Sequence, residues 1–211
     1  MSESNSEQFD PILTLVSGVP DLHDGSLLRW YESEVPDEVE PDADFAAIVL
    51  AQHFANFTLW NFEDEARRTD VTDVYIADLK RQIDGRNQRR NDLVELLDVA
   101  LLAAFEPHRG ADAQQNGETA GMMIDRLSIL SLKIWHMAIN ASRQDDKELA
   151  AECAGKLEVL HEQRADLATC VKQLLEDFAA GRRFFKLYRQ FKAYNDERLN
   201  PSIYKNKPVE R

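Results

Sequence analysis

The stretch HFANFTLWNFEDEARR, residues 53–68, has the periodicity of a helix with two different faces. The apolar face holds Ala55, Leu59, Phe62 and Ala66. The other face holds His53, Asn56, Trp60, Glu63, Asp64 and Arg67. Residues three or four apart lie on one side of a helix, so both sets are coherent surfaces. We predict a helix from about Asp44 to Arg68, with one face packed on its neighbours and one lining a polar interior.

Length and composition indicate a single globular domain. The chain has 211 residues, of which 44% are hydrophobic and 30% charged. No apolar run approaches the roughly 18 residues of a membrane span, so we expect none. The first residues, MSESNSEQFD, lack the features of a signal peptide, and a cytoplasmic location is expected. Cys153 and Cys170 fall on one predicted helix, about 25 Å apart, so they are expected to be buried free thiols.

Charge is distributed unevenly along the chain. The net charge of −13 argues against broad nucleic-acid binding, which depends on Lys and Arg. Residues 1–45 hold 12 acids and one Arg, whereas residues 182–211 hold nine basic residues and three acids. This asymmetry favours solubility or an approach of the two ends. The alternative is a contact for an anionic or protein partner through residues 182–207.

The pattern along the chain predicts an all-α antiparallel bundle of about five to six helices. Residues 1–43 are expected to form an acidic extension with a short helix and a proline-containing linker, residues 44–201 the bundle, and residues 202–211 a basic tail. After the helix of residues 44–68, further helices are predicted at 73–105, 120–142, 146–180 and 182–194. The helix at 120–142 is apolar nearly all round and should be central. Pro201 is expected to end any continuation.

Polar residues interrupt the apolar stripes of two helices. In the helix at 73–105, Asn87 and Arg90 lie in the middle of the inward stripe. A buried unpaired Arg costs several kcal/mol, so Arg90 should pair with Asp84, Glu63 or Asp64. The helix at 120–142 gathers polar groups opposite its apolar stripe. The predicted buried polar cluster is His53, Asn56, Glu63, Asp64, Arg67, Asp84, Asn87, Arg90, Asn91, Asp125, Arg126, Lys133 and His136.

The mixture of charges suits an anionic, hydroxyl-bearing ligand. Arginine can grip a phosphate or carboxylate, and Asp or Glu can orient hydroxyl groups or a divalent metal. Carboxylates beside histidine can also act as acid and base. The alternative is a closed salt-bridge network that fixes helix register.

Familiar catalytic motifs are missing from the sequence, including the phosphate-binding glycine loop, HExxH and GxSxG. The nearest pattern is that of all-α nucleoside triphosphate pyrophosphohydrolases, which hold magnesium with E-x-x-E and E-x-x-D motifs. Glu95 and Asp98 give one E-x-x-D, but EDEAR at 63–67 departs from E-x-x-E. The candidate metal ligands are Glu63, Asp64, Glu95 and Asp98.

Five segments resemble a bacterial family known as domain of unknown function 4254. They are HFANFTLWNFEDEAR, KRQIDGRNQRRNDLVELLD, IDRLSILSLKIWHM, CAGKLEVLHEQRADL and YNDERLNP, in this order across roughly residues 50–201. The resemblance implies an all-α fold and no assigned activity. It also implies a surface-polysaccharide context, because genes of this family often stand near glycosyltransferase genes.

Three functions remain open from the sequence, and whether the protein is an enzyme is among the open questions. The first is a binding site for a sugar phosphate or nucleotide sugar, with or without a divalent metal. The second is a non-enzymatic helical adaptor whose polar interior is structural. The third is a metal-dependent nucleotide pyrophosphohydrolase. An open cleft reached by His53, Arg90, Asp125 and Lys133 would favour the first, and a closed, fully paired network the second.

Overall fold

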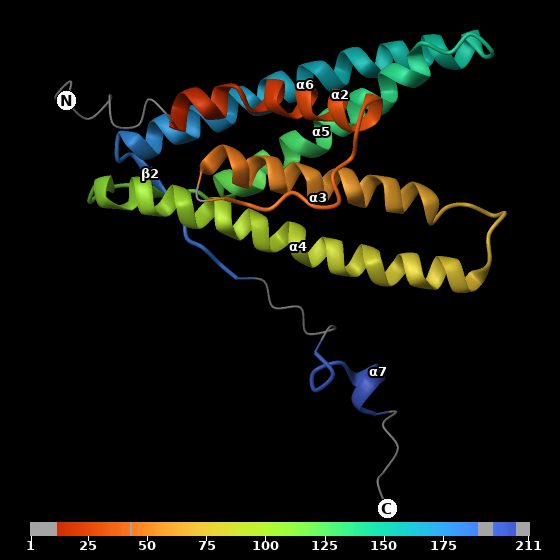
Figure 1. Cartoon of the computed structure of the whole chain (residues 1–211). Helices are drawn as coiled ribbons and strands as arrows, with labels where there is room; N and C mark the ends of the chain where they lie inside the picture. The colour runs from red at the N-terminus through yellow and green to blue at the C-terminus, as the bar shows by residue number, and fades with distance from the viewer. Residues whose placement is uncertain (1–11, 43, 190–195, 206–211) are drawn as a thin grey trace, which may run out of the picture.

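The computed structural model describes residues 12–42, 44–189 and 196–205, and most of them are helical. The main helices are α2 (Val19–Glu32), α3 (Phe45–Glu65), α4 (Asp73–Phe105), α5 (Ala120–Ala141) and α6 (Lys147–Ala179), as Figure 1 shows. A helical segment at 12–17 precedes them, a 3₁₀ turn follows α4 at Glu106–His108, and α7 (Pro201–Tyr204) comes last. The predicted all-α bundle is confirmed.

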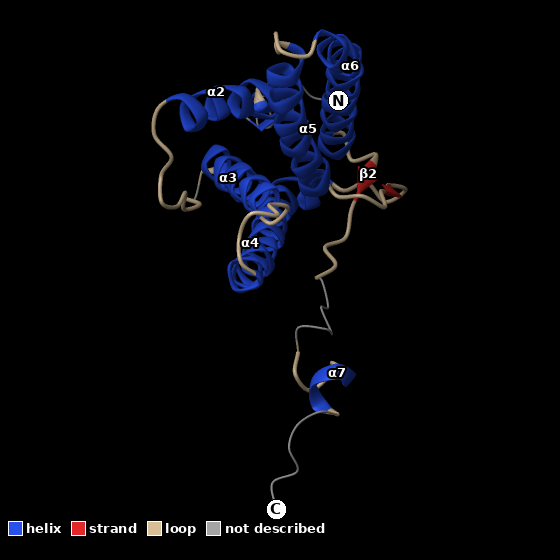
Figure 2. Ribbon diagram, turned by 90° about the vertical axis from the view of Figure 1, so that its right-hand side faces the viewer, coloured by secondary structure: helices blue, strands red, loops and turns tan. Residues whose placement is uncertain are grey.

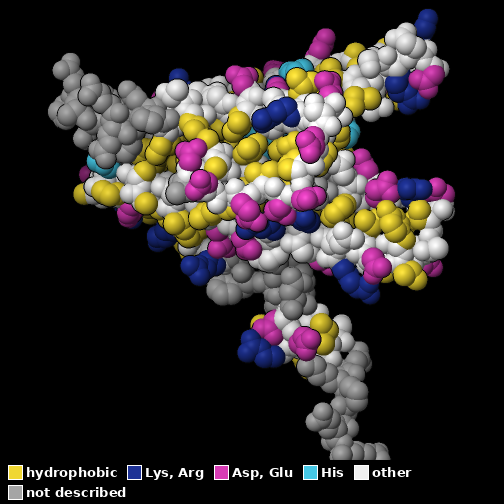
Figure 3. All heavy atoms as spheres, viewed as in Figure 1, with side chains coloured by type: hydrophobic (Ala, Val, Ile, Leu, Met, Phe, Trp, Pro, Cys, Tyr) yellow, Lys and Arg dark blue, Asp and Glu magenta, His cyan; other side chains and the backbone are white. Residues whose placement is uncertain are grey.

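Two antiparallel helical hairpins make up the body of the bundle. One hairpin is α3–α4 and the other is α5–α6, and α2 packs against both α5 and α3 (Figure 2). The hairpin tips, at residues 66–72 and 142–146, splay apart at the right of Figure 1. Figure 3 shows an open notch between them.

Polar caps fix where the long helices begin. The side chains of Thr72, Thr119 and Asp146 each accept a hydrogen bond from a backbone N–H in the first turn of α4, α5 and α6. Such caps satisfy donors that would otherwise have no partner in the helix. The observed bounds of these three helices agree with the predicted ones to within one residue.

The apolar core lies where α4, α5 and α6 meet. Leu97, Leu101, Leu127, Val171 and Phe178 are all buried there. A second, aromatic cluster fills the space between α2, α3 and α5. Its buried members are Leu27, Trp30, Phe54, Phe57 and Leu132. Helix α2 therefore packs within the bundle, although residues 1–43 were expected to be an extension.

Helices α4 and α5 approach closely at Gly121. A Cβ at this position would lie 2.6 Å from Oδ1 of Asp98 and 2.9 Å from the Val94 carbonyl oxygen. The Gly121 N–H donates a 2.8 Å hydrogen bond to the same Asp98 oxygen. Glycine therefore allows the carboxylate of α4 to reach the first turn of α5, where the helix dipole favours an anion.

The segment after α6 departs from the predicted helix at 182–194. Gly181 has a φ of 69° and ends α6, and its carbonyl accepts a 3.0 Å bond from the Gly110 N–H. A Cβ on Gly110 would lie 2.6 Å from the Gly181 oxygen. Next to this contact β2 (Arg183–Phe184) pairs in parallel with β1 (Gln114–Gln115). Residues 185–189 have no regular structure, and 190–194 lie outside the described residues.

Two smaller expectations concern single residues. Residues 196–200 are not helical, so no described helix continues into Pro201, and Pro201 itself starts α7, because the first helical turn has no use for the N–H that proline lacks. Cys153 is a buried free thiol as expected, but Cys170 is free and exposed.

The acidic linker between α2 and α3 runs across to α4. Glu38 forms an ion pair with Arg86, and Glu40 pairs with Arg89 at 2.7 Å. We call residues 34–44 the strap. These pairs hold it to a helix that follows it in sequence.

Candidate functional site

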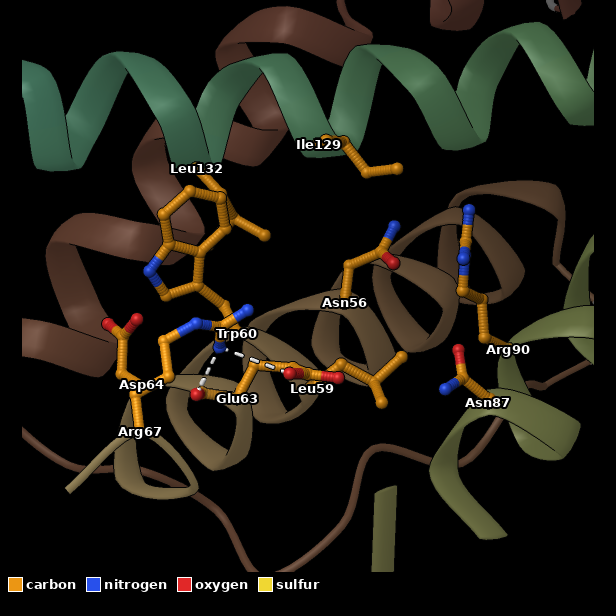
Figure 4. Close-up of a pocket in the computed structure, with 10 residues that line it drawn as sticks. All are labelled: Asn56, Leu59, Trp60, Glu63, Asp64, Arg67, Asn87, Arg90, Ile129 and Leu132. Carbon is orange, nitrogen blue, oxygen red and sulfur yellow. Dashed lines mark hydrogen bonds and ion pairs between the residues drawn. The ribbon is translucent and has the colours of Figure 1, made fainter. Parts of the chain in front are cut away.

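A cavity of about 300 Å³ lies between α3, α4 and α5. We call it the central pocket (Figure 4). Its lining residues are Asn56, Leu59, Trp60, Glu63, Asp64, Arg67, Asn87, Arg90, Ile129 and Leu132. Six of them belong to the polar cluster proposed from the sequence: Asn56, Glu63, Asp64, Arg67, Asn87 and Arg90.

The central pocket has an apolar wall and polar ends. Figure 4 shows Ile129 and Leu132 reaching down from α5. Trp60 stands at one end, next to Leu132, and the Arg90 guanidinium lies at the other. Pockets for small ligands commonly combine apolar walls with a few polar groups that fix orientation.

Arg90 is held in place by Asp125 of α5. Its Nε donates to Oδ1 at 2.7 Å, and its Nη2 donates to Oδ2. This two-point bond raises the pKa of Arg90. The Asp125 side chain is 8% exposed and that of Arg90 is 27% exposed. The expectation that Arg90 pairs with a carboxylate is confirmed, but the partner is Asp125.

Behind Arg90 a buried polar network connects α3 and α5. Gln52 and Asn56 donate to Oδ1 of Asp125 at 2.6 and 3.0 Å. Asn56 also donates to the Ser128 hydroxyl at 2.9 Å, and that hydroxyl lies 2.7 Å from Nδ1 of His53. Asp125 is thus held by Gln52, Asn56 and Arg90, and Asn56 and Arg90 also line the central pocket.

Two neutral histidines end this network inside the bundle. The rings of His53 and His23 are stacked with centroids 4.1 Å apart, and both side chains are fully buried. Burial lowers the pKa of His53 to about 3, partly offset by the His23 backbone, and lowers the pKa of His23 well below its usual value. The positive charge of Arg164 also lowers the pKa of His23. Among the residues that the structure describes, neither ring nitrogen of His23 has a hydrogen-bond partner.

The outer rim of the central pocket is more exposed. Arg67 and Glu63, one turn apart on α3, form a 3.1 Å ion pair whose side chains are 68% and 44% exposed. Trp60 stacks on His136 with ring centroids 4.7 Å apart. Burial lowers the pKa of His136, and the nearby Asp64 carboxylate offsets part of this effect.

His136 also contacts α2. Its Nε2 lies 2.8 Å from the Tyr31 hydroxyl, which donates to Oδ1 of Asn61 at 3.5 Å. Burial raises the pKa of Tyr31 to about 12. Because His136 stacks behind Trp60, it supports the wall of the central pocket without lining it.

The remaining residues of the predicted cluster lie elsewhere. Asp84 is exposed near Lys80, at 3.6 Å, and Arg126 is exposed and pairs with Glu118. Lys133 is exposed, and Asn91 is half-buried outside the lining of the central pocket. His53 and Asp125 belong to the closed network behind it. The single cleft expected to be reached by His53, Arg90, Asp125 and Lys133 is therefore not formed.

The four candidate metal ligands are not brought together. Glu63 and Asp64 line the central pocket, whereas Asp98 binds the first turn of α5 and Glu95 lies close to it. Burial raises the pKa of Asp98 to about 6, against the bonds from Thr119 and Gly121. Within the described ranges, no group of three or more His, Cys, Asp and Glu is placed to hold a metal ion.

Sequence reasoning missed four members of the polar interior. Gln52 and Ser128 stand one turn from Asn56 and Asp125, so helical spacing was the signal that could have found them. His23 and Tyr31 come from α2, which the acidic composition of residues 1–45 had set apart from the bundle.

Comparison with known proteins gives one match. A family model described as "Protein of unknown function (DUF4254)" matches residues 46–187. Neither the curated proteins nor the solved structures give any match. None of the helices in the described part of the chain is long and apolar enough to cross a membrane. The matched range contains α4, α5, α6 and all of α3 except Phe45, and so every residue that lines the central pocket, and the chain belongs to the DUF4254 family.

Proposed function

We propose that the protein binds a small sugar phosphate in the central pocket. The observation that carries the proposal is the lining itself. Two arginines, two carboxylates, two asparagine amides and one indole from two helices surround one cavity, beneath apolar residues of a third. This inventory suits a ligand with one anionic group and several hydroxyls.

Arg67 is the residue best placed to exchange its partner for a phosphate. Its ion pair with Glu63 joins two exposed side chains, and such pairs contribute only about 0.3–0.5 kcal/mol. A dianionic phosphate can compete with a single carboxylate for that guanidinium. Arg90 differs, because its bond to Asp125 is two-pointed and mostly buried. Arg90 supplies an oriented donor edge rather than a free charge.

The rest of the lining suits the sugar. Asn87 and Asp64 provide amide and carboxylate groups for hydroxyls, and the Trp60 ring offers a flat apolar surface. A volume of about 300 Å³ lies at the lower end of the range for ligand pockets, roughly 300–1,000 Å³. It therefore favours a monosaccharide phosphate over a nucleotide sugar. A surface-polysaccharide context would supply such compounds.

Ligand-induced stabilisation tests the proposal. The chain is melted with glucose 1-phosphate, glucose, inorganic phosphate and UDP-glucose, each as a separate arm. A ligand at 100 times its Kd adds about 2.7 kcal/mol to stability, which raises the Tm by roughly 5–10 °C in a protein of this size. We expect this shift with the sugar phosphate and a smaller one with glucose or phosphate alone.

Matched variants locate the effect. Arg67→Gln removes a charge from the central pocket, whereas Arg126→Gln removes one from an exposed pair outside it. Arg67→Gln should abolish most of the ligand-induced increase in Tm, and Arg126→Gln should leave it unchanged. Equal loss in both variants, or no shift with any of the four compounds, would count against the site.

The adaptor remains a second candidate, because one observation favours it. In the network of His53, Ser128, Asp125 and Arg90, the Asp125 carboxylate is bonded from several sides, as a structural register device would be. Arg182 and Arg183, which were considered for partner binding, are both tied to Asp177. Retention of a polysaccharide-assembly enzyme by the chain, unaffected by Arg67→Gln, would favour the adaptor.

A further inference from the structure

A second cavity, of about 530 Å³, lies on the opposite side of α3. We call it the aromatic pocket. Its rings are Trp30, Tyr31, Phe54, Phe57 and Phe62. Val35, Pro36 and Asp37 of the strap also line it, and Arg86 contributes from α4. No residue is shared with the lining of the central pocket. The two cavities are separate candidate sites.

Three ring pairs of the aromatic pocket are inclined to each other, whereas Phe54 and Phe57 are stacked with an interplanar angle of 24°. Trp30 is inclined by 72° to Phe54 and by 49° to Phe57, and Tyr31 is inclined by 67° to Phe57. The centroids are 4.9–5.2 Å apart in these three pairs. Because Trp30 and Tyr31 are inclined to the phenylalanine rings, the aromatic lining of this cavity is not one flat stack. A compact, rounded group fits this space better than a long planar one.

The strap gives the mouth of the aromatic pocket a negative charge. From Glu32 to Asp44 the sequence holds seven Asp or Glu and no Lys or Arg. Glu38 and Glu40 are neutralised by Arg86 and Arg89. Asp37 lines the cavity, is exposed, and makes no ion pair in the described part of the chain. Arg86 already pairs with Glu38, so the Asp37 carboxylate makes the local charge at the cavity negative.

The polar groups inside the aromatic pocket are largely occupied. The Thr58 hydroxyl donates to the Phe54 carbonyl at 2.9 Å, and the Asn61 amide donates to the Phe57 carbonyl at 3.0 Å. Both bonds belong to α3 itself. Few free donors remain for a phosphate or a sugar. The chemistry left open is that of aromatic faces and one carboxylate.

We propose that the aromatic pocket binds a small organic cation, of the quaternary or tertiary alkylammonium class. Aromatic faces attract such a cation through their quadrupoles, and the attraction grows when the cation leaves water. The Asp37 carboxylate at the mouth supplies the counter-charge. The two ion pairs of Glu38 and Glu40 hold the strap, and with it Asp37, over the rings.

Calorimetry with choline and its uncharged isostere tests this assignment. The isostere, 3,3-dimethylbutan-1-ol, has the same shape without the positive charge. We expect choline to bind about tenfold more tightly, in keeping with the strength of desolvated cation–π contacts. Equal affinities would overturn the proposal and leave a merely apolar cavity. No choline binding at millimolar concentration would also overturn it.

Three variants separate charge, ring and background. Asp37→Asn removes the counter-charge, and Phe62→Leu keeps an apolar side chain but removes one aromatic face. Each substitution should lower the affinity for choline several-fold and change the affinity for the isostere little. Glu34→Gln removes a strap charge outside the lining and should leave both affinities unchanged. Because Asp37 is exposed, its replacement should not unfold the bundle. If Asp37→Asn binds choline with the affinity of the parent chain, the assignment fails. None of these residues lines the central pocket, so the sugar-phosphate proposal stands or falls separately.

Discussion

The contact between α4 and α5 is formed by apolar side chains at one end and by polar side chains at the other. At one end Leu97 and Leu101 of α4 are fully buried among apolar neighbours of α6. At the other end the same two helices face each other through Arg90 and Asp125. The apolar end depends on filled volume, which many side chains can supply. The polar end depends on particular partners, since a buried charge without its partner is costly. We therefore expect stability to respond differently to substitution at each end.

The largest effect is expected for Asp125→Ala. Removing this carboxylate leaves the Arg90 guanidinium and the amides of Gln52 and Asn56 without their acceptor. Loss of one partner of a buried pair costs about 3–5 kcal/mol. Urea denaturation should show this loss, while Arg126→Ala, the exposed next residue, should stay within about 0.5 kcal/mol. A loss of less than about 1 kcal/mol for Asp125→Ala would mean that Arg90 finds water as an adequate substitute.

Leu97→Ala should cost about 3 kcal/mol, within the range for fully buried leucines. The cause is lost apolar burial together with an unfilled cavity. Leu97→Met should cost much less, because methionine keeps the volume. No such conservative rescue is expected for Asp125. If Leu97→Met lowered the free energy of unfolding as much as Leu97→Ala, the apolar end would also depend on particular side-chain shapes. The two ends would then not differ in the way proposed.

Acidification should weaken the polar end by about 2 kcal/mol between pH 8 and pH 5. The unfolded chain protonates His53 near pH 6.5, but burial lowers the folded pKa to about 3. This contribution is fully present above pH 6.5 and is lost as the pH falls below it. Asp98 acts in the opposite sense, because its pKa is raised to about 6 in the folded protein. Its protonation therefore stabilises the folded protein as the pH falls from about 6 to 4.

The Asp98→Asn variant isolates the histidine contribution. Without the opposing carboxylate, unfolding free energies measured between pH 8 and pH 5 should fall more steeply than in the parent chain. A flat profile in this variant would show that the buried histidines do not remain neutral in the folded state.

The smallest effect on stability is expected for Arg67→Gln. The pair of Arg67 and Glu63 is exposed, so its loss should change the unfolding free energy by less than about 0.5 kcal/mol. Its effect on sugar-phosphate binding should nonetheless be large. Asp125→Ala should instead reduce stability strongly, and it also removes the partner that orients Arg90 in the central pocket. A substantial destabilisation by Arg67→Gln would mean that the pair at the rim of the central pocket also stabilises the fold.

Helix existence and bounds were predictable from the sequence because long periodic stretches and side-chain caps act locally. The caps at Thr72 and Thr119 mark the starts of α4 and α5 to the residue. The end of α6 at Gly181 was predictable too, but the path of the chain after it was not. It depends on a contact between Gly181 and the distant Gly110, and on strands of two residues, which have no periodicity.

The candidate site was only partly predictable because a polar stripe is wide. Around α5, Asp125 and His136 point within about 20° of each other, and Arg126 and Lys133 lie about 80–100° from Asp125. Only the first pair faces the interior. On α4, Arg90 faces α5, but Asp84 and Asn91 are turned about 100–120° away. Periodicity groups these residues together, but only the packing of the other helices decides which edge of a stripe is enclosed.

The contact between Gly110 and Gly181 has a consequence for how relatives of this chain can vary. A side chain at either position would push its Cβ to within 2.6 Å of a backbone oxygen. Neither residue can therefore be exchanged alone while the loop after α4 stays against the end of α6. In an alignment we expect the two columns to change together, with a longer or rerouted 106–119 loop wherever both glycines are lost. Such coupled change would mark, from sequence only, the family members whose chain leaves α6 in another direction.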